Sequence, residues 1–186
     1  MPDVILATTP LDPLARPLID DLIREYDHRY GNFFNAAGAA EELNRYPPEA
    51  FAPPDGNFLL VLRDGQTIAG GAFKRFDERT AEVKRMWTRR DLRRQGLAAA
   101  VLAELEAQAL RQGYDRFYLT TGFRQPEAVR LYLSLGYTAL FDVAADPETY
   151  RHLPFEKELR HPAPRAASAV ALPLQQTATP PEAAAR

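Results

Sequence analysis

The sequence predicts a mixed α/β domain, built on a mostly antiparallel, twisted sheet of six to seven strands with helices on both faces. Strand-like segments cluster first at residues 57–88, and the chain then alternates strand, helix, strand, helix, strand. Hydrophobic residues make up 46% of the 186 positions and charged residues 26%, a balance typical of globular proteins. We assign residues 1–160 to one domain and the Ala- and Pro-rich residues 161–186 to a flexible tail.

The N-terminal part is predicted to hold one strand and two helices. An apolar run at residues 4–8, followed by Pro10 and Pro13, is typical of a strand that ends in a turn. Residues 14–29 carry apolar side chains at helical spacing and predict an amphipathic helix. A second helix is expected at residues 36–45, before a proline-rich loop that must be extended and is long enough to be functional.

The middle of the chain predicts three consecutive strands. Residues 57–62 and 67–76 are joined by a turn that contains Asp64 and Gly65, and Asp-Gly supplies the positive φ angles of a tight hairpin. Residues 81–88 follow as the third strand.

The C-terminal half predicts two helices that alternate with strands. Residues 96–112 place apolar side chains on one face, and Gly113 follows where a helix end favours a left-handed residue. The remaining elements are expected in this order: a strand at 115–121, a helix at 126–135, a strand at 137–143 and a last strand at 154–159.

Several classes of function are disfavoured by composition. The chain has no cysteine, its two serines lack a nucleophile-elbow setting, and its three histidines are widely spaced, so no metal site is expected. The net charge of −2 disfavours a nucleic-acid partner. No apolar run approaches the ~18 residues of a membrane span, and no targeting segment stands out, so we expect a cytoplasmic protein without a membrane partner.

The strongest chemical signal lies where the strand at residues 81–88 leads into the helix that begins at Gly96. A helix N-terminus exposes free N–H groups and about half a positive charge, which together bind phosphate. Gly96 allows close approach of the backbone, Ala98 leaves room, and Arg93 and Arg94 add cationic donors. By itself a basic turn with one glycine could equally be a solvated loop. The P-loop and dinucleotide glycine patterns are both missing from it.

Three segments in order resemble the GNAT superfamily of N-acetyltransferases. The pattern Arg-x-x-Gly-x-Ala at 93–98 is similar to that family's coenzyme A pyrophosphate loop. Residues 81–88 look like its central strand, and residues 127–137 look like its Ala-x-x-Leu-Tyr-x-x-x-Gly-aromatic helix end. The resemblance covers most of residues 57–159 and implies the GNAT fold, whose sheet is splayed at the two central strands.

That resemblance implies that acetyl-CoA is the acyl donor and that its pantetheine arm pairs like an added strand between the parted strands. A backbone N–H near Met86 or Trp87 would face the thioester oxygen. Many relatives have Asn before the second helix where this chain has Gln125, which leaves substrate choice open. The residues expected to bind the cofactor are Met86, Trp87, Thr88, Arg93, Arg94, Gln95, Gly96, Leu97, Ala98, Thr121, Gln125 and Ala128.

The resemblance also suggests two catalytic residues. Tyr132 is the candidate acid, because a phenol of pKa ~10 suits protonation of a thiolate, although a packed core tyrosine is the alternative. Glu82 is the candidate base, with an ion pair to Lys84 or Arg85 as an equally weighted alternative. For Trp87 a core position is favoured over catalytic use of its ring. Weak candidates for the acceptor pocket are Tyr26, Tyr30, Phe34 and Phe73.

The function expected from these features is transfer of acetyl from acetyl-CoA to a primary amine of a small molecule or peptide, by direct attack in a ternary complex. The protein would be a monomer or a homodimer. One alternative is a non-catalytic acyl-CoA-binding or regulatory module. A weaker alternative is a nucleic-acid binder that uses the basic residues of 84–94, but strand alternation is expected to send Lys84 and Arg85 to opposite faces.

Overall fold

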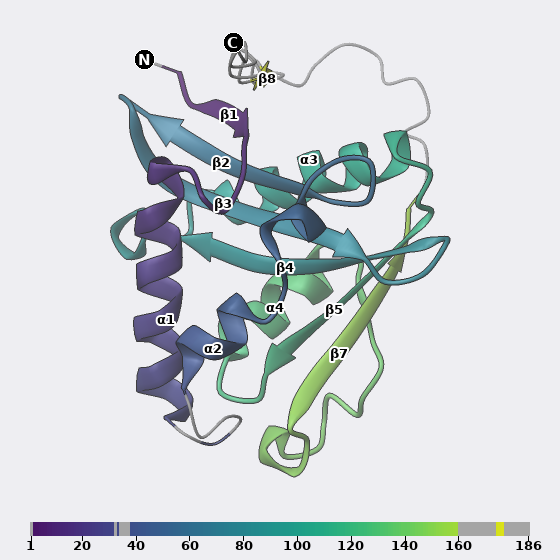
Figure 1. Ribbon diagram of the computed structural model, residues 1–186. Helices are drawn as coiled ribbons and strands as arrows, with labels where there is room; N and C mark the ends of the chain where they lie inside the picture. The colour runs from purple at the N-terminus through teal and green to yellow at the C-terminus, as the bar shows by residue number, and fades with distance from the viewer. Residues whose placement is uncertain (1, 32, 34–37, 160–173, 177–186) are drawn as a thin grey trace, which may run out of the picture.

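The computed structural model describes residues 2–31, 33, 38–159 and 174–176, which form one mixed sheet flanked by helices (Figure 1). The strand order is β6-β7-β5-β4-β3-β2-β1-β8; the pairs β4–β5 and β1–β8 are parallel and the others antiparallel, which confirms the predicted class. The strands are β1 (Val4–Ala7), β2 (Asn57–Arg63), β3 (Gln66–Arg75), β4 (Thr80–Thr88), β5 (Arg116–Gly122), β6 (Thr138–Ala139), β7 (His152–Glu158) and β8 (Leu174–Gln176).

Helices cover both faces of the sheet because neighbouring residues of β2 point to opposite sides. Phe58 and Leu60 pack with the first helix, whereas Leu59 and Val61 pack with the third. The helices are α1 (Arg16–Tyr30), α2 (Ala39–Asn44), α3 (Leu97–Arg111) and α4 (Pro126–Ser134). Figure 1 shows α1 and α2 in front of the sheet and α3 and α4 behind it. Within the described ranges, no helix has the length and apolar character needed to cross a membrane.

The hairpin between β2 and β3 confirms the prediction from Asp-Gly. Asp64 has φ 51° and Gly65 has φ 76°, the left-handed conformations that a tight two-residue turn requires. The register pairs Arg63 with Gln66 directly across this turn.

The strand predicted at residues 137–143 is wrong in length, because β6 contains only Thr138 and Ala139. The Asp142 side chain accepts a hydrogen bond from the Ala144 N–H at 2.9 Å, a local turn that competes with strand pairing. Leu140 is 47% exposed and Val143 is 58% exposed, so the chain is held to β7 there mainly by Phe141, which packs against Phe155, and not by a strand face of alternating buried residues.

Three further predictions concern the ends of elements. The chain enters α1 through a 3-10 turn at Pro13–Ala15, so the predicted helix 14–29 begins later and ends at Tyr30. Of the helix predicted at 36–45, residues 36 and 37 lie outside the described residues, and α2 begins after Gly38. In the predicted tail, residues 161–173 and 177–186 also lie outside them, and β8 pairs with β1.

The two central strands part along their length. β4 and β5 pair only from Thr80–Arg116 to Glu82–Tyr118, although the strands continue to Thr88 and Gly122. Backbone groups of residues 83–88 that face β5 therefore have no strand partner among the described residues. This opening at the C-terminal ends of β4 and β5 is the splay that the resemblance implied.

A β-bulge occurs in β4 next to this opening. Trp87 pairs with Gly70 and Lys84 with Ala72, so Arg85 and Met86 together lie opposite Gly71. Arg85 has φ 58°, the left-handed conformation of the bulged residue. The side chains of Lys84 and Arg85 consequently lie on the same face, over the rings of Tyr46 and Phe51, and the prediction from strict alternation is wrong.

Candidate active site

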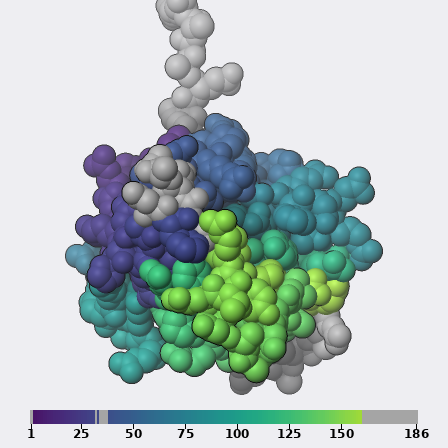
Figure 2. Space-filling view, turned by 90° about the horizontal axis from the view of Figure 1, so that it is seen from below, coloured from purple at the N-terminus to yellow at the C-terminus, as the bar shows by residue number. Residues whose placement is uncertain are grey.

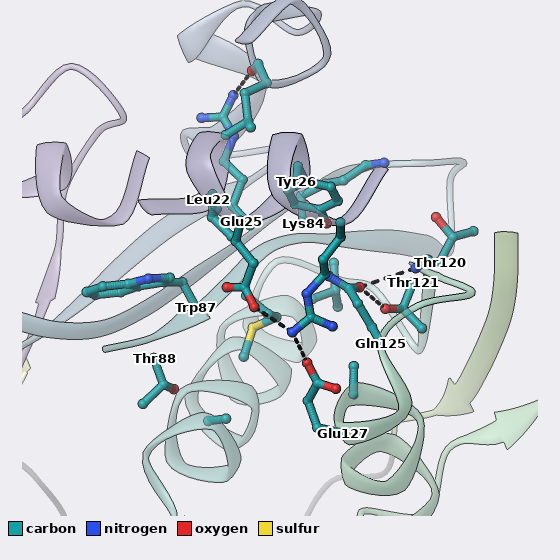
Figure 3. Close-up of a pocket in the computed structure, with 18 of the residues that line it drawn as sticks. Leu22, Glu25, Tyr26, Lys84, Trp87, Thr88, Thr120, Thr121, Gln125 and Glu127 are labelled. Carbon is teal, nitrogen blue, oxygen red and sulfur yellow. Dashed lines mark hydrogen bonds and ion pairs between the residues drawn. The ribbon is translucent and has the colours of Figure 1, made fainter. Parts of the chain in front are cut away.

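A cavity of about 1030 Å³ occupies the opening between β4 and β5 (Figure 3). It is lined by α1 and α2 on one side and by the N-terminal ends of α3 and α4 on the other. Seen from below, the end of α1 lies beside the segment that leads into α4, where Arg29 and Arg124 each donate to the other's backbone carbonyl (Figure 2). All of the predicted cofactor-binding residues line the cavity except Gln95, which is exposed on the loop before α3.

The start of α3 presents free backbone donors to this cavity. Gly96 has φ 79° and Arg94 has φ 64°, so the loop turns sharply into the helix. The Ala100 N–H donates to the Gly96 carbonyl at 3.0 Å, the first such bond of the helix. The N–H groups of residues 94–99 have no backbone acceptor among the described residues, and with the helix dipole they form a site suited to an anion.

The side chain of Arg93 bonds both to α1 and to the end of β4. Its guanidinium contacts the Glu25 carboxylate at 3.0 Å and donates from Nε to the Thr88 carbonyl at 3.3 Å. Glu25 also accepts from Arg29 at 2.7 Å, and Arg29 reaches Glu127 of α4 (Figure 3). Arg93 is thus a link between α1 and the loop, and Arg94 is the loop arginine whose side chain has no ion pair among the described residues.

Polar groups line the walls of the opening. Thr88 Oγ1 is buried and has no hydrogen-bond partner among the described residues, so it can bond to a ligand in the cavity. Across the opening, Gln125 Oε1 accepts from the Gly122 N–H at 3.2 Å and from the Thr121 hydroxyl. These bonds fix the side chain of Gln125, which stands where many relatives have Asn.

Tyr132 lines the cavity from α4. Its ring is buried against Tyr137 and Phe155, with centroids 5.6 and 5.5 Å away. No hydrogen bond of its hydroxyl is present among the described residues. Burial strongly raises the pKa of Tyr132, with a further contribution from Tyr26 nearby. The hydroxyl is therefore protonated at neutral pH and can donate a hydrogen bond to a group in the cavity, but the raised pKa makes it a weaker acid than an ordinary phenol.

Glu82 lies beside the cavity but is not one of its lining residues. Its carboxylate contacts Lys84 at 2.7 Å and Lys74 at 2.9 Å. Burial acts to raise the pKa of Glu82, but the two lysines outweigh it and the net pKa is lowered. The ion pair with Lys84, one of the two roles predicted for Glu82, is therefore present, and the lowered pKa makes the carboxylate a weaker base.

Trp87 is buried in the core between the sheet and α1, and its indole N–H donates to Asp21 at 2.7 Å. This fits the expected core position. It follows the bulge in β4 and is also one of the residues that line the cavity.

The predicted acceptor-pocket residues divide into three groups. Tyr26 and Tyr30 line the cavity from α1. Phe73 is fully buried against Tyr114 and Phe117 in the core, so its prediction as a pocket residue is wrong. Strand alternation at β3 turns it toward α3 and away from α1. Phe34 lies outside the described residues.

Two residues of the site were missed by sequence reasoning. Glu25 is only 7% exposed, and with Arg29 it lines the cavity. A signal for both exists in the helical spacing, because Glu25 and Arg29 continue the stripe of Leu18 and Leu22 at intervals of three and four residues. Charged side chains on the buried stripe of an amphipathic helix indicate a polar site rather than a solvated face.

Comparison with known proteins gives the same family for most of the chain. Residues 19–137 match the family model of the Acetyltransferase (GNAT) family. The sequence is 38% identical over 130 residues to the uncharacterized N-acetyltransferase YsnE of Bacillus subtilis (strain 168), covering 68% of this chain and 83% of that protein.

Two solved structures show the same fold at low sequence identity. One is an acetyltransferase of the GNAT family from Staphylococcus aureus Mu50, with a TM-score of 0.66, 13% identity, and coverage of 86% of this chain and 100% of that one. The other is a GNAT family acetyltransferase from Elizabethkingia anophelis with acetyl-CoA bound, with a TM-score of 0.59, 16% identity, and coverage of 84% and 98%. The chain belongs to the GNAT family of acetyltransferases.

Proposed function

We propose that this protein transfers an acetyl group from acetyl-CoA to the primary amine of a small molecule, by direct attack in a ternary complex. The observation that carries the proposal is the continuity of one cavity. It joins the free N–H groups at the start of α3, the unpaired edge of β4 and the hydroxyl of Tyr132. The structure from Elizabethkingia anophelis with acetyl-CoA bound supports the choice of donor.

Different residues of the cavity would bind different parts of acetyl-CoA and of the acceptor. The α3 N-terminus and Arg94 would hold the diphosphate, and the unpaired backbone of β4 beyond Glu82 would pair with the pantetheine arm. The buried hydroxyl of Thr88 would bond to that arm. Residues of α1 and α2, including Tyr26, would cover the acceptor.

The proposed acetyl transfer needs one general acid from the protein, to protonate the leaving thiolate. The neutral amine attacks the thioester carbon, and the carbon–sulfur bond breaks. The nitrogen of the tetrahedral intermediate loses a proton to solvent, Tyr132 donates its proton to the departing thiolate, and Tyr132 then regains a proton from solvent. A backbone N–H at the bulge, at Met86 or Trp87, would stabilise the oxyanion. We assign Glu82 to holding Lys84 rather than to accepting the amine proton, because two ion pairs already occupy its carboxylate.

Tyr132→Phe tests both binding and chemistry. We expect kcat to fall about 100- to 1000-fold, because the acid is lost, while acetyl-CoA still raises the melting temperature as in the wild type. Thiol release from acetyl-CoA with a panel of amines measures turnover.

The control is Tyr150→Phe, which removes a hydroxyl outside the cavity. Stabilisation by acetyl-CoA without turnover for any amine would support the non-catalytic acyl-CoA-binding module instead. No stabilisation by acetyl-CoA at all would contradict both functions.

A further inference from the structure

The half of the cavity under α1 and α2 is rich in positive charge. Besides Glu25 and Arg29 of α1, which pair with each other, four of its lining side chains are cationic and one, Glu42, is a carboxylate. The cations are Arg45, Lys84, Arg85 and Arg151. Arg45 contacts Glu42 at 3.7 Å and Lys84 contacts Glu82 at 2.7 Å, so these two are at least partly neutralised.

Arg85 differs from these neighbours because it is half-buried and has no carboxylate partner among the residues that the structure describes. The bulge in β4 turns the side chain toward α2, where the guanidinium lies 4.3 Å from the centre of the Phe51 ring and donates to the Leu43 carbonyl. Burial lowers the pKa of Arg85 to about 10, and no acidic group contributes to its pKa. A guanidinium has five N–H donors, so one bond to Leu43 leaves donors for a ligand.

His152 and Arg151 also line the cavity, and neither adds negative charge to it. Burial lowers the pKa of His152, opposed by Glu42, so this side chain is mainly neutral at neutral pH. Arg151 lies 5.4 Å from the centre of the Phe33 ring and has no ion pair among the described residues. An unpaired buried charge is costly, and a bound oxyanion would relieve that cost for Arg85.

Positive charge at this position would also help the chemistry. Nearby cations lower the pKa of a bound ammonium group, and only the neutral amine is a nucleophile. A substrate that carries its own negative group would bind in such a pocket, whereas a polyamine would be repelled by it.

We propose that the acceptor is an amine that also carries an oxyanion group, a carboxylate or a phosphate, and that Arg85 binds this group through its guanidinium. The proposal rests on the proposed function, because it names the substrate class of the same site. It makes Arg85 the residue that determines acceptor specificity.

The test compares matched acceptors with and without the anion. ω-Amino acids of increasing chain length are compared with their primary amides, and O-phosphoethanolamine with ethanolamine, which separates carboxylate from phosphate. Thiol release gives kcat/KM for each. Trp87 is the chain's one tryptophan and lines the cavity, so its fluorescence measures binding of the same compounds without turnover.

For the wild type we expect kcat/KM to be about 10- to 100-fold higher for one anionic series than for its neutral counterpart, the range of a hydrogen bond to a charged group. Arg85→Gln should bring this ratio close to one, mainly by lowering kcat/KM for the anionic amines. Arg85→Lys should recover part of the ratio, because it keeps the charge but loses the fork geometry. The control Arg16→Gln removes an exposed arginine outside the cavity and should leave the ratio unchanged.

The outcomes separate this inference from the proposed function. Equal turnover of anionic and neutral amines, or a ratio unchanged in Arg85→Gln, would overturn the inference and leave the acetyltransferase intact. Anion binding that quenches Trp87 and is lost in Arg85→Gln, without turnover of any amine, would keep the anion site and overturn the proposed function. Absence of both signals would overturn both.

Discussion

Glu82 holds the ion pair with Lys84, one of the two roles predicted for it with equal weight. Its carboxylate lies between two lysines of neighbouring strands, Lys74 and Lys84, and each side chain is mostly shielded from water. The arrangement keeps Lys84 beside Tyr46, at 5.5 Å from the ring centre, on the wall of the part of the cavity that we propose holds the acceptor.

The lowered pKa of Glu82 has a defined consequence for stability. Because the folded state lowers this pKa below its ordinary value of 4.5, the ion pairs contribute fully above that pH and are lost as the pH falls through the folded value. Glu82→Gln should therefore lower the free energy of unfolding by about 3 kcal/mol at pH 7, and the difference from wild type should shrink below pH 4.5.

Urea unfolding across a pH series measures this effect. Glu78→Gln is the matched control, because Glu78 is exposed and has no ion pair among the described residues. A gap between wild type and Glu82→Gln that stays the same at pH 3 and pH 7 would show that the lysine pairs do not stabilise the fold.

At the scale of elements, the start of α3 is the feature on which the proposed binding of acetyl-CoA depends. Ala98 is the second residue of the helix and lines the cavity. A carboxylate at this position stabilises the helix dipole but repels a diphosphate bound to the same N–H groups. Binding and stability should therefore change in opposite directions.

Ala98→Glu should weaken acetyl-CoA binding at least about tenfold, while the melting temperature of the free protein stays the same or rises slightly. Ala98→Gln has the same shape without the charge and should lose much less affinity. Titration calorimetry with acetyl-CoA measures both. If both variants bind acetyl-CoA as tightly as the wild type does, the diphosphate does not lie at this helix end.

At the scale of the whole molecule, α1 is tied to the opposite layer across the gap between β4 and β5. Glu25 accepts from Arg29 and Arg93, and Arg29 extends the chain of contacts to Glu127 at the start of α4 (Figure 3). β4 and β5 form no backbone hydrogen bonds to each other in this region. We therefore expect the ion pairs of Glu25, Arg29 and Glu127 to help hold α1 against α4.

Glu25→Gln should lower the free energy of unfolding by roughly 2 kcal/mol, because two partly buried guanidinium groups lose a shared carboxylate. Glu41→Gln, at an exposed position of α2, should change it by less than about 0.5 kcal/mol. Thermal and urea unfolding of the two variants gives the comparison. Equal stabilities for both would mean that the network is not needed to hold α1 in place.

Much of the molecule follows from local sequence. The Asp64-Gly65 turn, the stripe of Leu18 and Leu22, and Gly113 after α3 predict their elements because each depends on backbone preference or on periodicity within a few residues. The loop at residues 93–98 is predicted for the same reason, since a phosphate site at a helix start needs only the helix, a glycine and nearby cations.

The sequence by itself determined the order of the main helices and strands and the family resemblance. It also predicted that Gly96 lies at the start of a helix and Tyr132 within one. Only the tertiary structure decided that Arg93 pairs with Glu25, that Glu82 is held by two lysines, and that a bulge turns Arg85 beside Lys84. The physical reason is that ion pairs between distant segments and the register of neighbouring strands depend on which surfaces meet, and no local preference encodes them.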